Sequence, residues 1–95
     1  MVRPLWDRIG SLEGQSLTTI TGRTFVVRWV GRGGNGGLTV VPDRSGVPRQ
    51  ISRRQFDEAD RLGLVRHDVT PGHLRDAQIS GHNDSYVVAI LRAIA

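Results

Sequence analysis

Apolar and polar residues alternate along the first half of the chain, a pattern typical of half-buried β-strands. The runs 16–20, 24–30 and 38–41 are rich in β-branched residues and are separated by turn-forming glycine, proline and aspartate, which predicts three strands. The run 47–51 predicts a fourth strand, and Pro48 marks it as an edge strand or a strand entry.

In the run "TFVVRWV" the side chains divide between two faces. Phe25, Val27 and Trp29 share one face, which we expect to face the core. Val26 and Val30 belong to the other face, which we expect to be less buried.

Apolar residues recur at helical spacing in four places. Leu5, Ile9 and Leu12 predict a short first helix that Gly14 can end. A second helix is expected from Ser52, with "SRRQ" as a capping box, to Gly63. "TPGHLRDA" predicts a shorter helix capped by its threonine, and "SYVVAILRAIA" predicts a closing helix that packs across the sheet.

These elements predict the fold class. We expect one α+β domain over residues 1–95, in which a short antiparallel sheet of three or four strands packs with two or three helices. A chain of 95 residues is long enough for one modest core.

Composition narrows the functional classes. Cysteine is absent, which excludes disulfides, thiolate metal sites and thiol catalysis. No apolar run reaches the roughly 18 residues of a membrane span, and the first residues do not resemble a signal peptide. We therefore expect a soluble, cytoplasmic protein that has no membrane partner.

The net charge of +4 is unevenly distributed. Residues 1–56 hold nine arginines and three acidic residues, whereas residues 57–95 hold four arginines and six acidic residues. All 13 positive residues are arginine, which suits bidentate contacts to phosphate or guanine. A G+C-rich genome would also supply arginine in place of lysine, so composition alone leaves both explanations open.

The stretch "GRGGNGG", residues 31–37, matches the letters of a dinucleotide-binding loop and follows a strand. Such a loop works because a helix begins at it and points its amides at the pyrophosphate. Here "GLTVVPD" follows, so no helix is expected. We interpret the stretch as a hairpin connection whose tip carries Arg32.

Catalytic and metal signatures are missing. His67, His73 and His82 match no zinc spacing, and we expect them to be exposed or to cap helices. The carboxylates of residues 57–60 crowd one helix without any sign of a cleft, and no serine follows the pattern of a hydrolase nucleophile. We expect no enzyme activity, no metal and no cofactor.

Arg53 and Arg54 begin the second predicted helix, where positive charge is unfavourable by some tenths of a kcal/mol. Two kinds of interaction could offset this unfavourable charge. The arginines can pair with Asp57 and Glu58 at i,i+4 spacing, or they can hold an anion such as a nucleic-acid phosphate.

The aromatic residues fall at apolar-periodic positions, so we expect them in the core rather than on a base-stacking surface. Only Trp29 beside Arg28 suggests a stacking site. The five residues are Trp6, Phe25, Trp29, Phe56 and Tyr86.

Three phrases in order, "TGRTFVV", "LTVVPDRSGVPRQISRRQFDEA" and "NDSYVVAIL", resemble a small accessory domain associated with restriction-type endonucleases and other bacterial or phage defence proteins. The likeness covers residues 17–94. The resemblance implies DNA recognition beside a separate catalytic domain. It implies Arg49, Ser52 and Tyr86 as the matching site residues in this chain. We find no nuclease motif in residues 1–95, and the glycine tip is longer than the family pattern.

The sequence therefore predicts a non-enzymatic DNA-binding module, in a restriction, defence or phage context, whose arginines contact phosphates. The alternative is a protein-interaction or homo-oligomerisation module that docks on an acidic partner. The sequence leaves open whether duplex, single strand or RNA is preferred. The predicted nucleic-acid-binding residues are Arg23, Arg28, Arg32, Arg44, Arg49, Ser52, Arg53 and Arg54.

Overall fold

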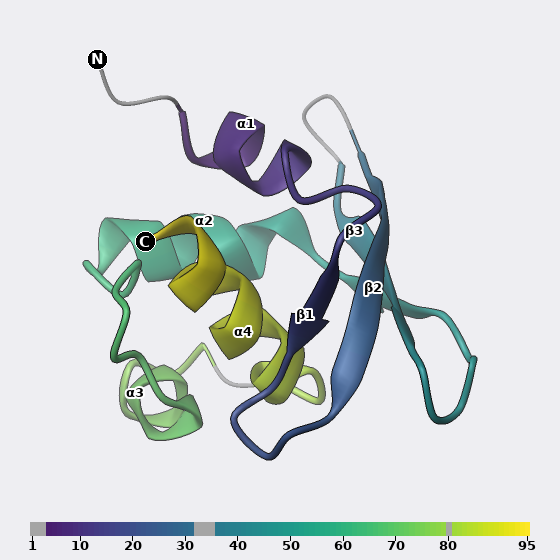
Figure 1. The fold of residues 1–95 in the computed structure, drawn as a ribbon. Helices are drawn as coiled ribbons and strands as arrows, with labels where there is room; N and C mark the ends of the chain where they lie inside the picture. The colour runs from purple at the N-terminus through teal and green to yellow at the C-terminus, as the bar shows by residue number, and fades with distance from the viewer. Residues whose placement is uncertain (1–3, 32–35, 80) are drawn as a thin grey trace.

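The computed structural model describes residues 4–31, 36–79 and 81–95. They form a four-stranded antiparallel sheet and four helices, so the α+β fold class is confirmed (Figure 1). All four segments with a helical pattern are helices, whereas two or three were expected to pack with the sheet. Each helix in this part of the chain is too short or too polar to cross a lipid bilayer.

The sheet follows the order of the chain. Each strand pairs with the next, in the order β1-β2-β3-β4, which leaves β1 and β4 as edge strands. The expected edge position of the strand that follows Pro48 is thus confirmed. The strands are β1 Ser16–Thr18, β2 Thr24–Val30, β3 Leu38–Pro42 and β4 Arg49–Ile51.

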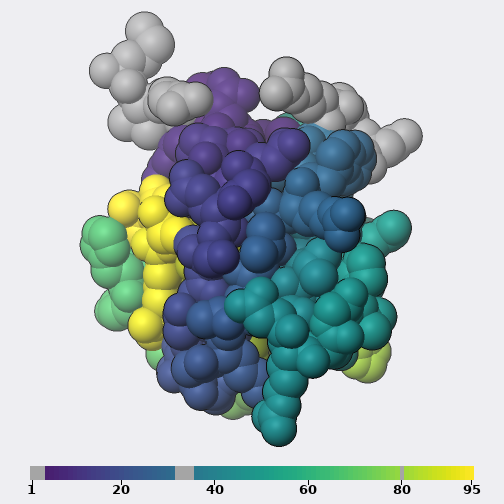
Figure 2. Space-filling model, turned by 45° about the vertical axis from the view of Figure 1, so that its right-hand side comes forward, coloured from purple at the N-terminus to yellow at the C-terminus, as the bar shows by residue number. Residues whose placement is uncertain are grey.

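One face of the sheet is covered and the other is open. Core residues alternate along the strands, with Leu38, Val40 and Pro42 buried on β3 while Thr39 and Val41 between them are half-buried. All four helices lie on the covered side (Figure 1). In the space-filling view the blue and teal strand region fills the front, and α3 and α4 show only at the margins (Figure 2).

A β-bulge in β2 overturns two side-chain predictions. Val27 lies opposite Val40 and Trp29 opposite Thr39, so that Arg28 is an extra residue between them. The alternation shifts by one position at this point. Trp29 is therefore 54% exposed on the open face rather than in the core, and Val30 is buried rather than on the less buried face.

The glycine-rich stretch connects β2 to β3 as a hairpin, as expected. The Gly31 amide donates to the Gly37 carbonyl at 2.7 Å. A Cβ on Gly36 would lie 2.8 Å from the Gly31 carbonyl carbon, and one on Gly37 would lie 2.4 Å from the Ile51 oxygen. Glycine is needed here because three backbone segments meet too closely for side chains. Arg32, at the predicted tip, lies outside the described residues.

The first two helices are α1 Leu5–Gly10 and α2 Arg53–Arg61. Ser52 is the N-cap residue of α2, but its side chain makes no capping hydrogen bond, so the predicted capping box is wrong. Gln55 instead donates to the Ile79 carbonyl at 2.9 Å and to an Asp84 carboxylate oxygen at 3.3 Å. These tertiary contacts replace the local one that the sequence suggested.

The last two helices are α3 Pro71–Asp76 and α4 Asp84–Ile94. Thr70 caps α3 as predicted, and His73 supplies the reciprocal bond of the capping box. Six residues of α4 are buried, so this helix forms the centre of the helical layer.

Candidate nucleic-acid interface

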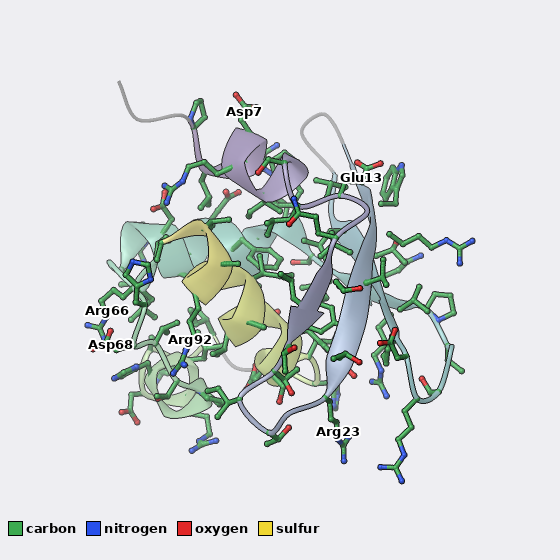
Figure 3. All side chains as sticks on the ribbon, viewed as in Figure 1. Asp7, Glu13, Arg23, Arg66, Asp68 and Arg92 are labelled. Carbon is green, nitrogen blue, oxygen red and sulfur yellow. The ribbon has the colours of Figure 1, made fainter. Side chains whose placement is uncertain are left out.

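Three of the predicted arginines meet at one end of the sheet. Arg23 follows the β1–β2 turn, Arg44 lies in the β3–β4 turn and Arg49 begins β4. They line a cavity of about 470 Å³ together with Tyr86 from the first turn of α4. Figure 3 labels Arg23 at the start of β2, where its side chain points out of the domain. We call this cavity the arginine pocket.

Hydroxyl groups border the arginine pocket. An adjoining cavity of about 300 Å³ shares Arg23, Arg49 and Tyr86 and adds hydroxyl and imidazole groups from Thr19, Thr21, His82 and Ser85. Thr19 is 4% exposed, and its side-chain oxygen accepts a hydrogen bond from the Arg23 amide at 3.1 Å. This contact fixes the turn that carries Arg23.

One carboxylate, that of Asp43, also lines the arginine pocket. Its Oδ2 accepts a hydrogen bond from the Thr24 hydroxyl. It forms no ion pair within 4.0 Å with a described arginine. Three arginines and one aspartate therefore line the pocket, which leaves a net positive charge there.

A second group of residues lies at the other end of β4. Ser52, Arg53 and Arg54 line a cavity of about 610 Å³, which we call the tryptophan pocket. Trp29, Thr39 and Gln50 contribute side chains from the open face of the sheet, and Gly36 and Gly37 contribute backbone. The three-residue strand β4 thus separates two pockets that each contain arginines.

The two arginines of α2 differ in their surroundings. Arg53 pairs with Asp57 at 3.4 Å and lies over the Trp6 ring, 5.0 Å from its centroid, so the predicted internal compensation is confirmed for this residue. For Arg54 it is wrong, because the Glu58 carboxylate pairs with Arg61 at 2.7 Å instead.

The structure therefore collects the predicted residues into two groups rather than one continuous surface. Arg28 lies apart from both, exposed in the bulge of β2. Within residues 4–31, 36–79 and 81–95, no carboxylate oxygen lies within 4.0 Å of the guanidinium nitrogens of five arginines, namely Arg23, Arg28, Arg44, Arg49 and Arg54.

Two aromatic residues that were expected in the core line the pockets instead. Trp29 lines one pocket and half-buried Tyr86 lines the other. The Tyr86 ring also packs edge to face on Phe25, with 5.0 Å between ring centroids. Only the polar neighbour Arg28 signalled the exposure of Trp29, because sequence spacing does not reveal a bulge.

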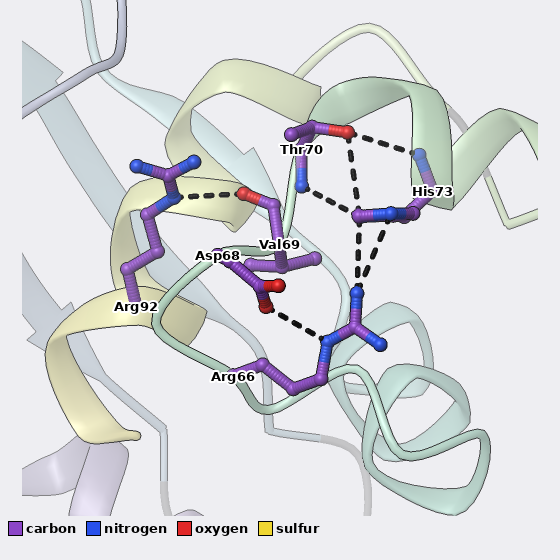
Figure 4. A network of polar contacts seen from close by, with 6 residues as sticks. All are labelled: Arg66, Asp68, Val69, Thr70, His73 and Arg92. Carbon is purple, nitrogen blue, oxygen red and sulfur yellow. Dashed lines mark hydrogen bonds and ion pairs between the residues drawn. The ribbon is translucent and has the colours of Figure 1, made fainter.

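On the helical side, arginines and histidine hold backbone in place. Arg92 donates to the Val69 carbonyl at 2.7 Å, and Arg66 pairs with Asp68 at 3.0 Å (Figure 4). His73 accepts from the Thr70 amide at 3.0 Å, which confirms a capping role. Among the residues that the structure describes, no three metal-binding side chains come together.

Comparison with protein-family models, curated proteins and solved structures gives no significant match. The resemblance to restriction-associated accessory domains therefore stays a prediction. Of the residues carried over from it, Arg49 and Tyr86 share the arginine pocket, while Ser52 lies in the tryptophan pocket.

Proposed function

We propose that this chain is a non-enzymatic DNA-binding module that holds phosphate groups through arginine side chains. The observation that carries the proposal is the convergence of Arg23, Arg44 and Arg49 on one pocket without a described ion-pair partner. Three arginines that line one pocket give it a positive charge, which attracts an anion. The guanidinium fork binds both carboxylate and phosphate in bidentate geometry, and phosphate is the group that DNA presents.

Two features favour a polyanion over a small isolated anion. Ser52, Arg53 and Arg54 lie beyond the end of β4, roughly 10 Å along the strand from Arg49. A second arginine-containing pocket at that distance suits a ligand that carries successive phosphates. Both pockets border the edge strand β4, with Arg49 on the face of buried Ile51 and Gln50 on the open face, so a ligand that crosses this edge can reach both.

The resemblance found in the sequence supports a restriction, defence or phage setting. In that setting the module would recognise DNA while a separate protein performs any cleavage.

The test removes two arginines from the arginine pocket and compares the result with an equal loss of charge elsewhere. Arg23→Ala with Arg49→Ala removes two phosphate contacts and should lower the slope of log affinity against log salt by about 1.8 on duplex DNA, or about 1.4 on single strands. The matched control is Arg61→Ala with Arg66→Ala, which removes two arginines that are already paired with carboxylates. Its slope should stay unchanged.

Fluorescence anisotropy with labelled oligonucleotides between low and moderate salt measures both slopes. Equal slopes for the two double variants would show that only net charge matters. Absence of binding to either form of DNA at low salt would overturn the proposal.

The alternative, a protein-interaction module, is favoured by one observation. The large apolar side chains of Ile20, Trp29 and Val47 are exposed by 51%, 54% and 60% respectively, and a protein partner could bury them. Purified protein that carries no material absorbing at 260 nm and elutes as a nuclease-insensitive oligomer would favour this alternative.

A further inference from the structure

We propose that the tryptophan pocket receives an unpaired nucleobase stacked on Trp29, so that the module prefers single-stranded DNA to duplex. This inference rests on the proposed function and specifies the form of DNA bound. It uses side chains outside the arginine pocket.

Trp29 has the position of a stacking platform. The bulge at Arg28 turns the ring to the open face, opposite Thr39, where it is 54% exposed. One end of the ring lies close to the Gly31 backbone, since a Cβ built on that glycine would be 2.9 Å from Trp29 Cη2. The rest of the ring is open to solvent, where a base can stack on its face.

Polar groups for the edge of a base lie beside the ring. Thr39, Gln50 and Ser52 line the pocket, and none of their side chains forms a hydrogen bond with another described residue. The glutamine amide offers a donor and an acceptor together, which suits the edge of a base.

Positive charge lies at the rim of the same pocket. Arg54 is exposed, with no carboxylate in ion-pair range among the residues that the structure describes, and Arg53 lies next to it over Trp6. A base bound at Trp29 brings its own phosphate, and these two arginines can neutralise it. The pocket of about 610 Å³ lies within the size range of sites for nucleotide-sized ligands.

A duplex does not fit this arrangement. Its bases are stacked on both faces inside the helix, so the Trp29 ring could reach one only after the base had been extruded. A single strand presents unstacked bases without that cost.

The experiment compares Trp29→Ala and Trp29→Phe with the unmodified chain on an oligo(dT) strand of about 12 nucleotides and on its duplex with oligo(dA). Trp29→Ala should weaken single-strand affinity by about 5- to 150-fold, the range for losing one stacked base. Trp29→Phe should retain most of the affinity because it keeps an aromatic face. Duplex affinity should change much less. The matched control is Leu62→Ala, which truncates an exposed apolar residue on the helical side.

A second measurement does not depend on the alanine variant. Tryptophan fluorescence of the unmodified chain should be quenched when oligo(dT) is added, and this quenching should disappear in Trp29→Phe, where Trp6 remains. Duplex binding that is as tight as single-strand binding, together with an unchanged affinity for Trp29→Ala, would overturn this inference and leave the proposed function standing. Failure to bind either form at low salt would overturn both.

Discussion

Arginine residues have different surroundings on the sheet and on the helices. Arg23, Arg44 and Arg49 reach one pocket at the end of the sheet with no described carboxylate in ion-pair range. On the helical side, Arg66 pairs with Asp68, and Arg92 binds the Val69 carbonyl. The arginines of the pocket can therefore bind a ligand, whereas the two helical arginines already bind other groups of the protein.

This difference between the two sets of arginines bears on whether the high arginine content reflects ligand binding or only a G+C-rich genome. A G+C-rich genome would enrich arginine in both parts of the chain alike. It would not decide which guanidinium groups already bind another part of the fold. Arg66 binds a carboxylate and Arg92 a backbone carbonyl, whereas no described carboxylate lies in ion-pair range of Arg23, Arg44 and Arg49. This difference in binding, rather than the number of arginines, favours a ligand at the sheet.

The largest expected effect is on the sheet side, at Gly37. In Gly37→Ala the new methyl group would meet the Ile51 oxygen at 2.4 Å, so the pairing of β3 with β4 has to shift. We expect a loss of about 3 kcal/mol in unfolding free energy, measured by urea denaturation. The control is Gly10→Ala, where no atom lies within 4 Å and alanine should stabilise α1 by up to about 1 kcal/mol. Equal effects at the two sites would contradict the close approach.

Arg92 should have the next largest effect, because it supports backbone. Arg92→Ala leaves the carbonyl of fully buried Val69 without its charged donor, and we expect a loss of about 2 kcal/mol in the free energy of unfolding. Arg75→Ala, at an exposed position of α3, should cost less than about 0.5 kcal/mol. The salt slope of DNA binding should be the same in both variants. A lower slope for Arg92→Ala would mean that the two sets of arginines are not distinct.

The smallest expected effect comes from removing the carboxylate partner of an arginine on a helix, so that this arginine is unpaired like those of the sheet. Glu58→Gln removes the carboxylate that holds Arg61, an exposed pair worth less than about 0.5 kcal/mol. We expect an unchanged salt slope, because one freed arginine on α2 joins no pocket. Glu13→Gln removes the same charge from an exposed loop and serves as the control. If Glu58→Gln alone increased the slope, the helical face would also contact DNA.

Much of the fold could be predicted because local patterns and tertiary packing agree. The strand runs, the edge position of β4 and the Thr70 cap of α3 all follow from residue type and spacing. The hairpin interpretation of residues 31–37 was also confirmed, because β-branched residues and a proline after the glycines exclude a helix.

The candidate site was predicted only as a list of residues. Sequence spacing could not show that Arg23 and Arg44, from two different turns, reach the same pocket as Arg49. Nor could it show that the Glu58 carboxylate pairs with Arg61 rather than Arg54, since i,i+3 and i,i+4 partners are both near in a helix.

By itself the sequence determined the α+β class, the positions of the strands along the chain and the basic character of the part that builds the sheet. Only the tertiary structure decided that Trp29 faces outward and that the arginines form two pockets at the ends of β4. The reason is that a bulge inverts the side-chain alternation without leaving a mark in the residue pattern. Whether arginines from different turns reach the same pocket likewise depends on strand register, because the register sets which residues far apart in the chain lie side by side.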